Sequence, residues 1–313
     1  MSDRTPGGDA PEPRPRSYES GATRRAVLSS IGGAGLVGLR AADTVSARST
    51  SGGSYQSTDV VDFYLVAGQS NAVGKGTAAE SPTPNPGTAF EFNGSSLVAV
   101  EDPVGGHFDG TVTADTGSMW PAFCREYVRL TGRHVAFVQF AAGGTAQAAE
   151  AGSGSGNWDV DGDLREGAAD AAERALAHLA MEDYVVNVGG VLWSQGTRDA
   201  KAIDNGRLTA ETYRGALETL LTYFRARLGV DLPFHIIQTG TPNDGDTEGF
   251  RAVREAQRAV VADNAHTYLA SSLAETFAST GRMQDRVHYT QEGYNDLGRD
   301  VASTVTETLL ASR

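Results

Sequence analysis

A serine near the start of the chain and a histidine near its end have the surroundings of a nucleophile and its base. Ser70 follows an apolar run that ends at Ala67, and Asp285 lies three residues before His288. A hydroxyl nucleophile needs a base, and the base needs a carboxylate that fixes its tautomer. The alternative interpretation stays open, because serine is a common helix N-cap and a loop histidine can cap the helix expected from Thr290.

Two further segments contain good hydrogen-bond donors for a developing oxyanion. Gly143 and Gly144 follow the apolar run 135–140, and Gln195 follows another that ends at Trp193. Flexible glycine backbone and amide side chains suit this task, in which loss of one donor costs about 3 to 4 kcal/mol. Glycine serves equally well for turn geometry alone.

Alternating strands and helices must position these segments. Continuous apolar runs predict buried parallel strands, with helical periodicity between them. The predicted strands are 60–67, 135–140, 184–193, 234–238 and 267–270, and the predicted helices are 120–130, 164–181, 209–228, 248–264 and 291–310. This order predicts a three-layer α/β domain with a mainly parallel sheet. Within the Pro- and Gly-rich stretch 82–117, residues 89–100 are expected to form a hairpin around Asn93-Gly94.

Taken together, the motifs resemble one enzyme family. In chain order they are Gly68-Gln69-Ser70-Asn71, Gly143-Gly144-Thr145, Trp193-Ser194-Gln195-Gly196 and Asp285-x-x-His288-Tyr289-Thr290-x-Glu292-Gly293. This order resembles the SGNH (GDSL-like) hydrolases, and within them the sialate O-acetylesterase and acetylxylan esterase branch, carbohydrate esterase family six. The resemblance spans roughly Asp59 to the C-terminus. It implies a flavodoxin-like α/β/α fold and hydrolysis of O-acetyl esters on carbohydrate, with no metal and no cofactor.

The resemblance also implies residue roles. Ser70 would be the nucleophile that carries the acetyl group, His288 the base and Asp285 its orienting partner. The oxyanion hole would be formed by the N–H of Ser70, the N–H of Gly143 or Gly144, and the side chain of Gln195.

The chain departs from the family at one position. Many relatives have Gln-Gly-Glu after the tryptophan, whereas Thr197 and Arg198 follow Gly196 here. If that glutamate helps to hold the histidine in relatives, Thr197 cannot, so the role falls to Asp285. Arg198 brings positive charge to the expected mouth of the site, which favours an acidic sugar such as a uronate or a sialate.

Four residues are expected to contact the substrate. They are Gln69, Asn71, Trp158 and Arg198. Trp158 follows a Gly/Ser-rich loop, so it is a candidate for stacking on a sugar, although tryptophan is more often a core residue. Two alternatives to a carbohydrate esterase remain. A general GDSL-like lipase or thioesterase is disfavoured because no long apolar lid is present, and an inactive carbohydrate-binding protein because the triad is intact.

The charge balance excludes some partners. The net charge is −13, and only two of the 26 basic residues are lysines, Lys75 and Lys201. Such acidity argues against nucleic acid or an anionic membrane as partner, and indicates a protein adapted to concentrated salt. The single cysteine, Cys124, excludes an internal disulfide and is expected to be buried. No His spacing is typical of a metal site, and the sequence does not predict an oligomeric state.

The first 47 residues have the pattern of an export signal. A polar leader is followed by Arg24-Arg25, the apolar stretch Ala26–Leu39 and the small-residue cleavage site Val45-Ser46-Ala47. This resembles a twin-arginine signal. We therefore expect a signal in residues 1–47, a linker in 48–58 and the esterase domain in 59–313, with the mature protein exported and not inserted in a membrane.

Overall fold

A seven-stranded sheet forms the centre of the fold in a computed structural model that describes residues 60–311 except 107, 109–115, 153 and 183. The predicted signal and linker lie outside the described residues. The strands are β1 (Val60–Gly68), β2 (Ala89–Phe92), β3 (Leu97–Ala99), β4 (His134–Ala141), β5 (Val185–Ser194), β6 (Phe234–Ile237) and β7 (Thr267–Ser271). The longer helices are α2 (Trp120–Thr131), α3 (Leu164–Leu179), α5 (Ala210–Leu228), α6 (Glu248–Asp263) and α8 (Gln291–Ala311).

The strand order determines where a ligand can bind. The sheet runs β3-β2-β4-β1-β5-β6-β7, and its parallel strands β4-β1-β5-β6-β7 have the 2-1-3-4-5 order of flavodoxin-like folds. The order of connection reverses around β1. Ligands of open α/β sheets bind outside the carboxyl ends of the strands at this point, and the residues that follow β1, β4 and β5 therefore meet there.

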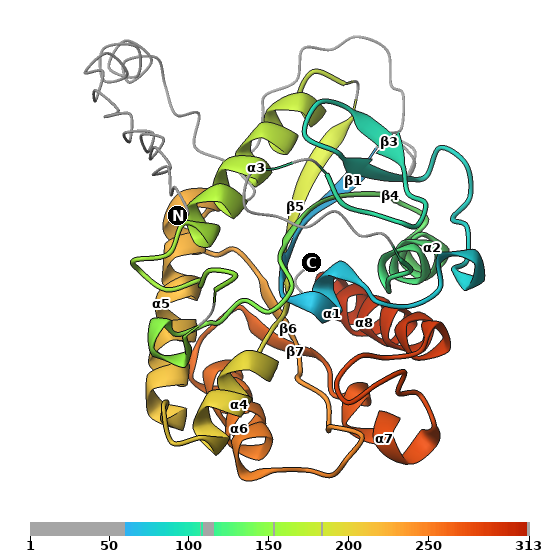
Figure 1. Ribbon diagram of the computed structural model, residues 1–313. Helices are drawn as coiled ribbons and strands as arrows, with labels where there is room; N and C mark the ends of the chain where they lie inside the picture. The colour runs from blue at the N-terminus through green and yellow to red at the C-terminus, as the bar shows by residue number, and fades with distance from the viewer. Residues whose placement is uncertain (1–59, 107, 109–115, 153, 183, 312–313) are drawn as a thin grey trace, which may run out of the picture. The chain divides into compact units, whose positions relative to one another are not determined.

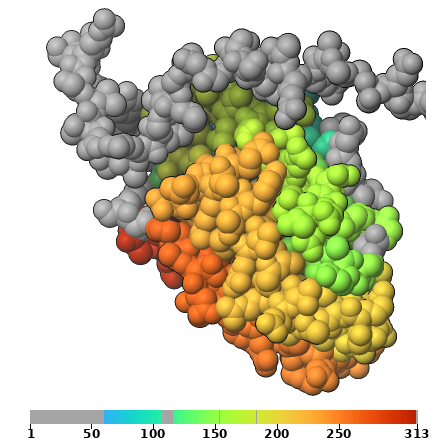
Figure 2. Space-filling model, turned by 90° about the vertical axis from the view of Figure 1, so that its left-hand side faces the viewer, coloured from blue at the N-terminus to red at the C-terminus, as the bar shows by residue number. Residues whose placement is uncertain are grey.

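Helices cover both faces of the sheet (Figure 1), and the side chains of β1 alternate between them. Val61, Phe63 and Leu65 pack in the cluster that includes α3, α5 and α6, whereas Tyr64 and Val66 pack with α2 and α8. Figure 2 shows the outer surface on the side of α3, α5 and α6, where orange segments adjoin the yellow and green segments that precede them in the chain. The three-layer α/β/α prediction is confirmed.

The five strands and five helices predicted from periodicity are present within about two residues at each end. The predicted hairpin is also present, as β2 and β3, and β2 extends the sheet by pairing in parallel with β4. Its turn spans four residues because the Asn93 side chain accepts hydrogen bonds from the N–H groups of Ser95 and Ser96. Cys124 is fully buried, as expected.

The short helices were not predicted from the sequence. They are α1 (Ser70–Val73), α4 (Thr197–Asp204) and α7 (Phe277–Thr280), with 3₁₀ turns η2 (Ala78–Glu80), η3 (Ala149–Ala151) and η4 (Leu273–Thr276). Segments this short contain too few turns to establish a pattern. Among the described residues, none of the helices is long and apolar enough to cross a membrane.

Candidate active site

The nucleophile turn joins β1 to α1. Gly68 has φ of +139°, and a Cβ at this position would lie 2.1 Å from the carbonyl oxygen of Ser194 on β5. Only glycine therefore allows β1 and β5 to stay paired at this end. The next residue, Gln69, donates its N–H to the same carbonyl at 2.9 Å. Ser70 then begins α1 at the sheet edge with a small exposed fraction of 9%.

The structure brings the predicted triad together. His288 Nε2 lies 2.9 Å from Ser70 Oγ, and His288 Nδ1 lies 2.7 Å from Asp285 Oδ2. The other Asp285 oxygen accepts the N–H groups of Val287 and His288 at 2.8 and 2.9 Å. Partial burial alone would raise the pKa of the Asp285 carboxyl, but hydrogen bonds from His288 and the two N–H groups hold it below its usual value. The carboxylate stays ionised and can orient the imidazole.

Asn71 connects the nucleophile turn to the histidine loop. Its Nδ2 donates to the Val287 carbonyl at 3.1 Å, and its Oδ1 accepts the Tyr294 hydroxyl at 2.7 Å. Its side chain is 6% exposed. The expectation that Asn71 contacts substrate is therefore corrected, because its amide is occupied in fixing His288 against Ser70.

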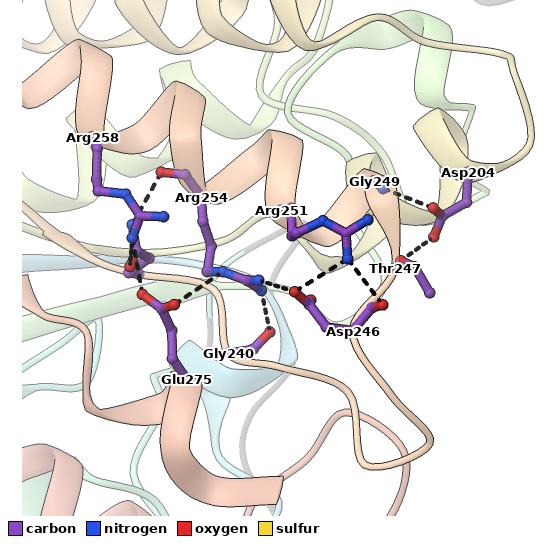
Figure 3. A network of polar contacts seen from close by, with 10 residues as sticks. Asp204, Gly240, Asp246, Thr247, Gly249, Arg251, Arg254, Arg258 and Glu275 are labelled. Atoms are coloured by element: carbon purple, nitrogen blue, oxygen red, sulfur yellow. Dashed lines mark hydrogen bonds and ion pairs between the residues drawn. The ribbon is translucent and has the colours of Figure 1, made fainter.

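A second loop, residues 238–247 after β6, supports the histidine loop from the other side. The Asn243 N–H donates to the Arg286 carbonyl at 2.9 Å, and Arg286 Nε pairs with Asp244 at 2.7 Å. The loop is anchored in turn by Arg254 of α6, whose guanidinium lies 2.7 Å from Asp246 (Figure 3).

Figure 3 shows how far this anchor extends. Arg254 also pairs with Glu275 at 3.4 Å and donates to the Gly240 carbonyl, and its side chain is only 4% exposed. Asp204, at the end of α4, accepts the Thr247 hydroxyl and the Gly249 N–H at the start of α6. Together these contacts connect loop 238–247 to α4, α6 and η4.

The loop after β4 provides the backbone donors. A Cβ on Gly143 would lie 3.8 Å from Ser70 Cβ, whereas one on Gly144 would point to Ser155. Among the described residues, the N–H groups of Ser70 and Gly143 have no hydrogen-bond acceptor. Two neighbouring, unoccupied backbone donors form the kind of site that stabilises an oxyanion. The geometry thus favours Gly143, a choice that the sequence left open.

Gln195 does not point to this site. Its Nε2 donates to Asp199 Oδ2 at 2.5 Å and to the Thr145 carbonyl at 3.4 Å, which uses both amide hydrogens. The expected role of its side chain as an oxyanion donor is therefore corrected. Gly196 has φ of +140°, and a Cβ there would lie 2.3 Å from Thr239 Oγ1, so this glycine is required by the turn.

The expectation that Trp158 stacks on a sugar is also corrected. Its side chain is fully buried, with the indole ring perpendicular to that of Trp193 at 5.0 Å, and its Nε1 donates to Thr145 Oγ1. Stacking on a sugar requires an exposed ring face, which this residue lacks. The Gly/Ser-rich loop before it suggested an exposed position, but burial of the large apolar ring prevailed.

The triad opens into a cavity of about 320 Å³. Its lining residues are Gln69, Ser70, Lys75, Gly143, Gly144, Thr197, Arg198, Lys201, Val287 and His288. Arg198 lies at the cavity, as expected, and its guanidinium donates to the Gly152 carbonyl. The two lysines were not predicted here, although their rarity in the sequence was a usable signal. Partial burial, followed by the charges of Arg286 and Arg198, lowers the pKa of Lys201.

Comparisons with known proteins identify the family. The family model described as "Carbohydrate esterase, sialic acid-specific acetylesterase" matches residues 60–307. The chain belongs to this carbohydrate esterase family. It is a carboxylic ester hydrolase with an SGNH hydrolase fold. A search of curated proteins finds no match.

Solved structures agree with the fold of this esterase. A protein from Arabidopsis thaliana is 19% identical, with a TM-score of 0.61 over 79% of this chain and 98% of that one. NanS is 14% identical, with a TM-score of 0.58 over 83% and 100%. A carbohydrate acetylesterase from Xanthomonas citri is 18% identical, with a TM-score of 0.51 over 79% of this chain and 56% of that one.

Proposed function

We propose that this esterase removes O-acetyl groups from carbohydrate through an acetyl-Ser70 intermediate, and that its sugar substrate carries a carboxylate. The observation that carries the proposal is the hydrogen-bonded series from Ser70 through His288 to Asp285, which opens into a cavity lined by both lysines of the chain. The family match and the acetylesterase neighbour from Xanthomonas citri support the acetyl ester.

The first half of the reaction transfers the acetyl group. Ser70 Oγ attacks the acetyl carbonyl while His288 Nε2 takes its proton, and Asp285 stabilises the resulting imidazolium. The N–H groups of Ser70 and Gly143 stabilise the tetrahedral oxyanion. Collapse of this intermediate breaks the bond to the sugar oxygen, which receives the proton from His288 and leaves as a hydroxyl.

The second half regenerates the enzyme. His288 takes a proton from water, whose oxygen attacks the acetyl carbonyl on Ser70. The second tetrahedral intermediate releases acetate, and the proton returns from His288 to Ser70 Oγ. Every step uses groups of this chain and one water molecule.

The charge around the cavity supports an acidic sugar. Lys75, Lys201 and Arg198 line the cavity of a protein whose net charge is −13. Neither lysine forms an ion pair within the part of the chain that the structure describes. Local positive charge in a cleft raises the concentration of an anionic substrate. The same cations disfavour the alternative of a lipase or thioesterase for long apolar acyl chains.

Acetate release in molar salt tests the proposal. The full-length protein and Ser70→Ala are offered acetylated pectin, acetylated xylan, O-acetyl sialic acid and 4-nitrophenyl acetate. We expect release that Ser70→Ala abolishes, with the acidic sugars preferred over xylan. Equal activity of the two proteins would contradict the role of Ser70 as nucleophile. No activity from a folded sample would favour the alternative of an inactive carbohydrate-binding protein.

We also propose that the protein is exported and acts in high salt. The paired arginines of the leader and the acidic composition support this. In the native host, the pair Arg24→Lys and Arg25→Lys should retain the protein in the cell. Unchanged export of this variant would contradict a twin-arginine route.

A further inference from the structure

A buried carboxylate ties together two segments of the active site. Asp199, in the first turn of α4, is fully buried. It accepts the Gln147 N–H at 2.9 and 3.0 Å, the Ala148 N–H at 3.0 Å and the Gln195 side-chain amide at 2.5 Å. Within the described residues, no cation pairs with it. An ionised buried carboxylate without a cation costs free energy, so several N–H donors must hold its charge.

The donors belong to the segment that contains the oxyanion glycine. Residues 142–148 leave β4, pass Gly143 beside Ser70, and reach Gln147 and Ala148 on Asp199. Between these points, Thr145 is held from two directions. Its carbonyl accepts Gln195 Nε2, and its hydroxyl donates to the Ala142 carbonyl. The Asp199 carboxylate therefore fixes one end of a short segment whose other end presents the Gly143 N–H.

We propose that Asp199 is a positioning residue that holds segment 142–148 so that the Gly143 N–H meets the oxyanion formed at Ser70. The proposal rests on the esterase function proposed above. It assigns a purpose to Gln195 as well, because the amide that was expected in the oxyanion hole instead acts through Asp199. Since a displacement of about 1 Å at a catalytic group can cost about 100-fold in rate, a loosened segment should be visible in kcat.

Ionisation of Asp199 gives the proposal a second readout. Burial raises the pKa of this carboxyl to about 6, against the opposing effect of its hydrogen bonds. The group is thus mainly ionised at pH 8 and mainly protonated at pH 5. A protonated carboxyl is a weaker acceptor for the N–H groups of Gln147 and Ala148. The titratable neighbour among the described residues is Tyr213 of α5, and burial raises the pKa of its hydroxyl far above the usual value, so it stays neutral.

The test compares two buried carboxylates. Asp199→Asn is set beside Asp62→Asn, because Asp62 is also fully buried and accepts the Tyr127 hydroxyl at 2.8 Å and the Asn187 amide at 2.6 Å. Asp62 differs in that it also pairs with Arg133 at 2.6 Å, so its loss should affect stability at least as strongly. Asp62 lies on β1 eight residues before Ser70, about 26 Å away along an extended strand. Turnover of 4-nitrophenyl acetate is measured for each variant after subtraction of the rate of Ser70→Ala, together with thermal unfolding by circular dichroism.

Asp199→Asn should lower kcat about 10- to 100-fold with KM changed less than about threefold. Asp62→Asn should lower the melting temperature but leave kcat within about twofold. In the wild type, kcat should show a loss of about 10- to 100-fold as the pH falls through about 6 and Asp199 protonates. This component of the pH dependence should be absent from Asp199→Asn.

The outcomes are separable. A folded Asp199→Asn with kcat within twofold of the wild type overturns the proposal. If this variant does not fold, the wild-type profile decides, and a profile without the additional loss near pH 6 overturns the proposal. Absence of Ser70-dependent turnover in the wild type contradicts the esterase function itself, which is a different result from normal turnover in Asp199→Asn.

Discussion

His288 Nε2 lies 2.9 Å from Ser70 Oγ, although 218 positions separate the two residues in the chain. The short distance arises because β1 delivers Ser70 to the carboxyl edge of the sheet, and the loop before α8 returns His288 to the same edge. Three contacts hold the histidine loop at this edge. The Asn71 side chain donates to the Val287 carbonyl, the Asn243 N–H donates to the Arg286 carbonyl, and the Arg286 guanidinium pairs with Asp244.

Asp285→Asn should lower kcat about 10²- to 10⁴-fold with KM little changed, because an amide stabilises the wrong imidazole tautomer. Steady-state kinetics on 4-nitrophenyl acetate measure the effect, with Asp170→Asn as a control, because this carboxylate is 58% exposed and pairs with Arg227. A loss of less than threefold in Asp285→Asn would mean that another group orients His288.

Lys201→Met should raise KM for an acetylated acidic sugar about fivefold to tenfold, because a partly exposed charge contributes about 1 kcal/mol. KM for acetylated xylan should not change. Lys75→Met and Arg198→Ala should act in the same direction, whereas Arg129→Met, whose side chain is 65% exposed in an ion pair with Glu126 on α2, should have no effect. An unchanged preference for acidic over neutral sugars in all three cavity variants would refute the substrate class.

Gly143→Ala should fold normally but lose about 10- to 100-fold in kcat. The backbone at Gly143 needs no left-handed conformation, and the nearest atom to an added Cβ is Ser70 Cβ at 3.8 Å. The methyl group therefore fits the protein but intrudes on the space of the oxyanion. Wild-type kcat in this variant would mean that a methyl group at position 143 does not reach the space of the oxyanion.

Arg254→Met should lower the free energy of unfolding by about 2 kcal/mol, since it removes the buried cation between Asp246 and Glu275. These carboxylates then keep only the more exposed Arg251 and Arg258. Urea unfolding measures the change. Arg251→Met is the matched control, because Arg251 is 52% exposed and lies 3.6 Å from the same Asp246, so its loss should cost less than about 0.5 kcal/mol. Similar losses in both variants would show that the buried ion pairs of Arg254 stabilise the protein no more than the exposed ion pair of Arg251.

His235 should make the protein less stable in acid. Burial lowers the pKa of this fully buried side chain to about 4, whereas an unfolded histidine titrates near 6.5. Between these values the unfolded state binds the additional proton, so the contribution of His235 is complete above about pH 6.5 and declines by about 3 kcal/mol as pH falls to 4. His235→Gln should flatten the pH dependence of the free energy of unfolding in this range, and an unaltered slope would contradict this cause.

The strands and long helices, and with them the layers, were predictable from the sequence. A buried strand leaves a continuous apolar run, and a long helix repeats its apolar positions over several turns. The triad was expected from the combined order of the four motifs and their resemblance to the SGNH hydrolases, since neither Ser70 nor the Asp285-x-x-His288 spacing was decisive by itself. The orientation of Gln195 was not predictable, since its amide can reach either the oxyanion or Asp199, and only the position of α4 decides. The burial of Trp158 was not predictable either, because the Gly/Ser-rich loop before it does not reveal whether its ring faces the core or the solvent.

The central claim is that Ser70 carries the acetyl group, and acid quench during turnover of 4-nitrophenyl acetate tests it most directly. The full-length enzyme is quenched within the first turnover, digested and mapped by mass spectrometry. We expect an acetyl group on the peptide that contains Ser70 in the wild type and none in Ser70→Ala. An acetyl group on another residue, or rapid turnover without any acetylated peptide, would contradict it.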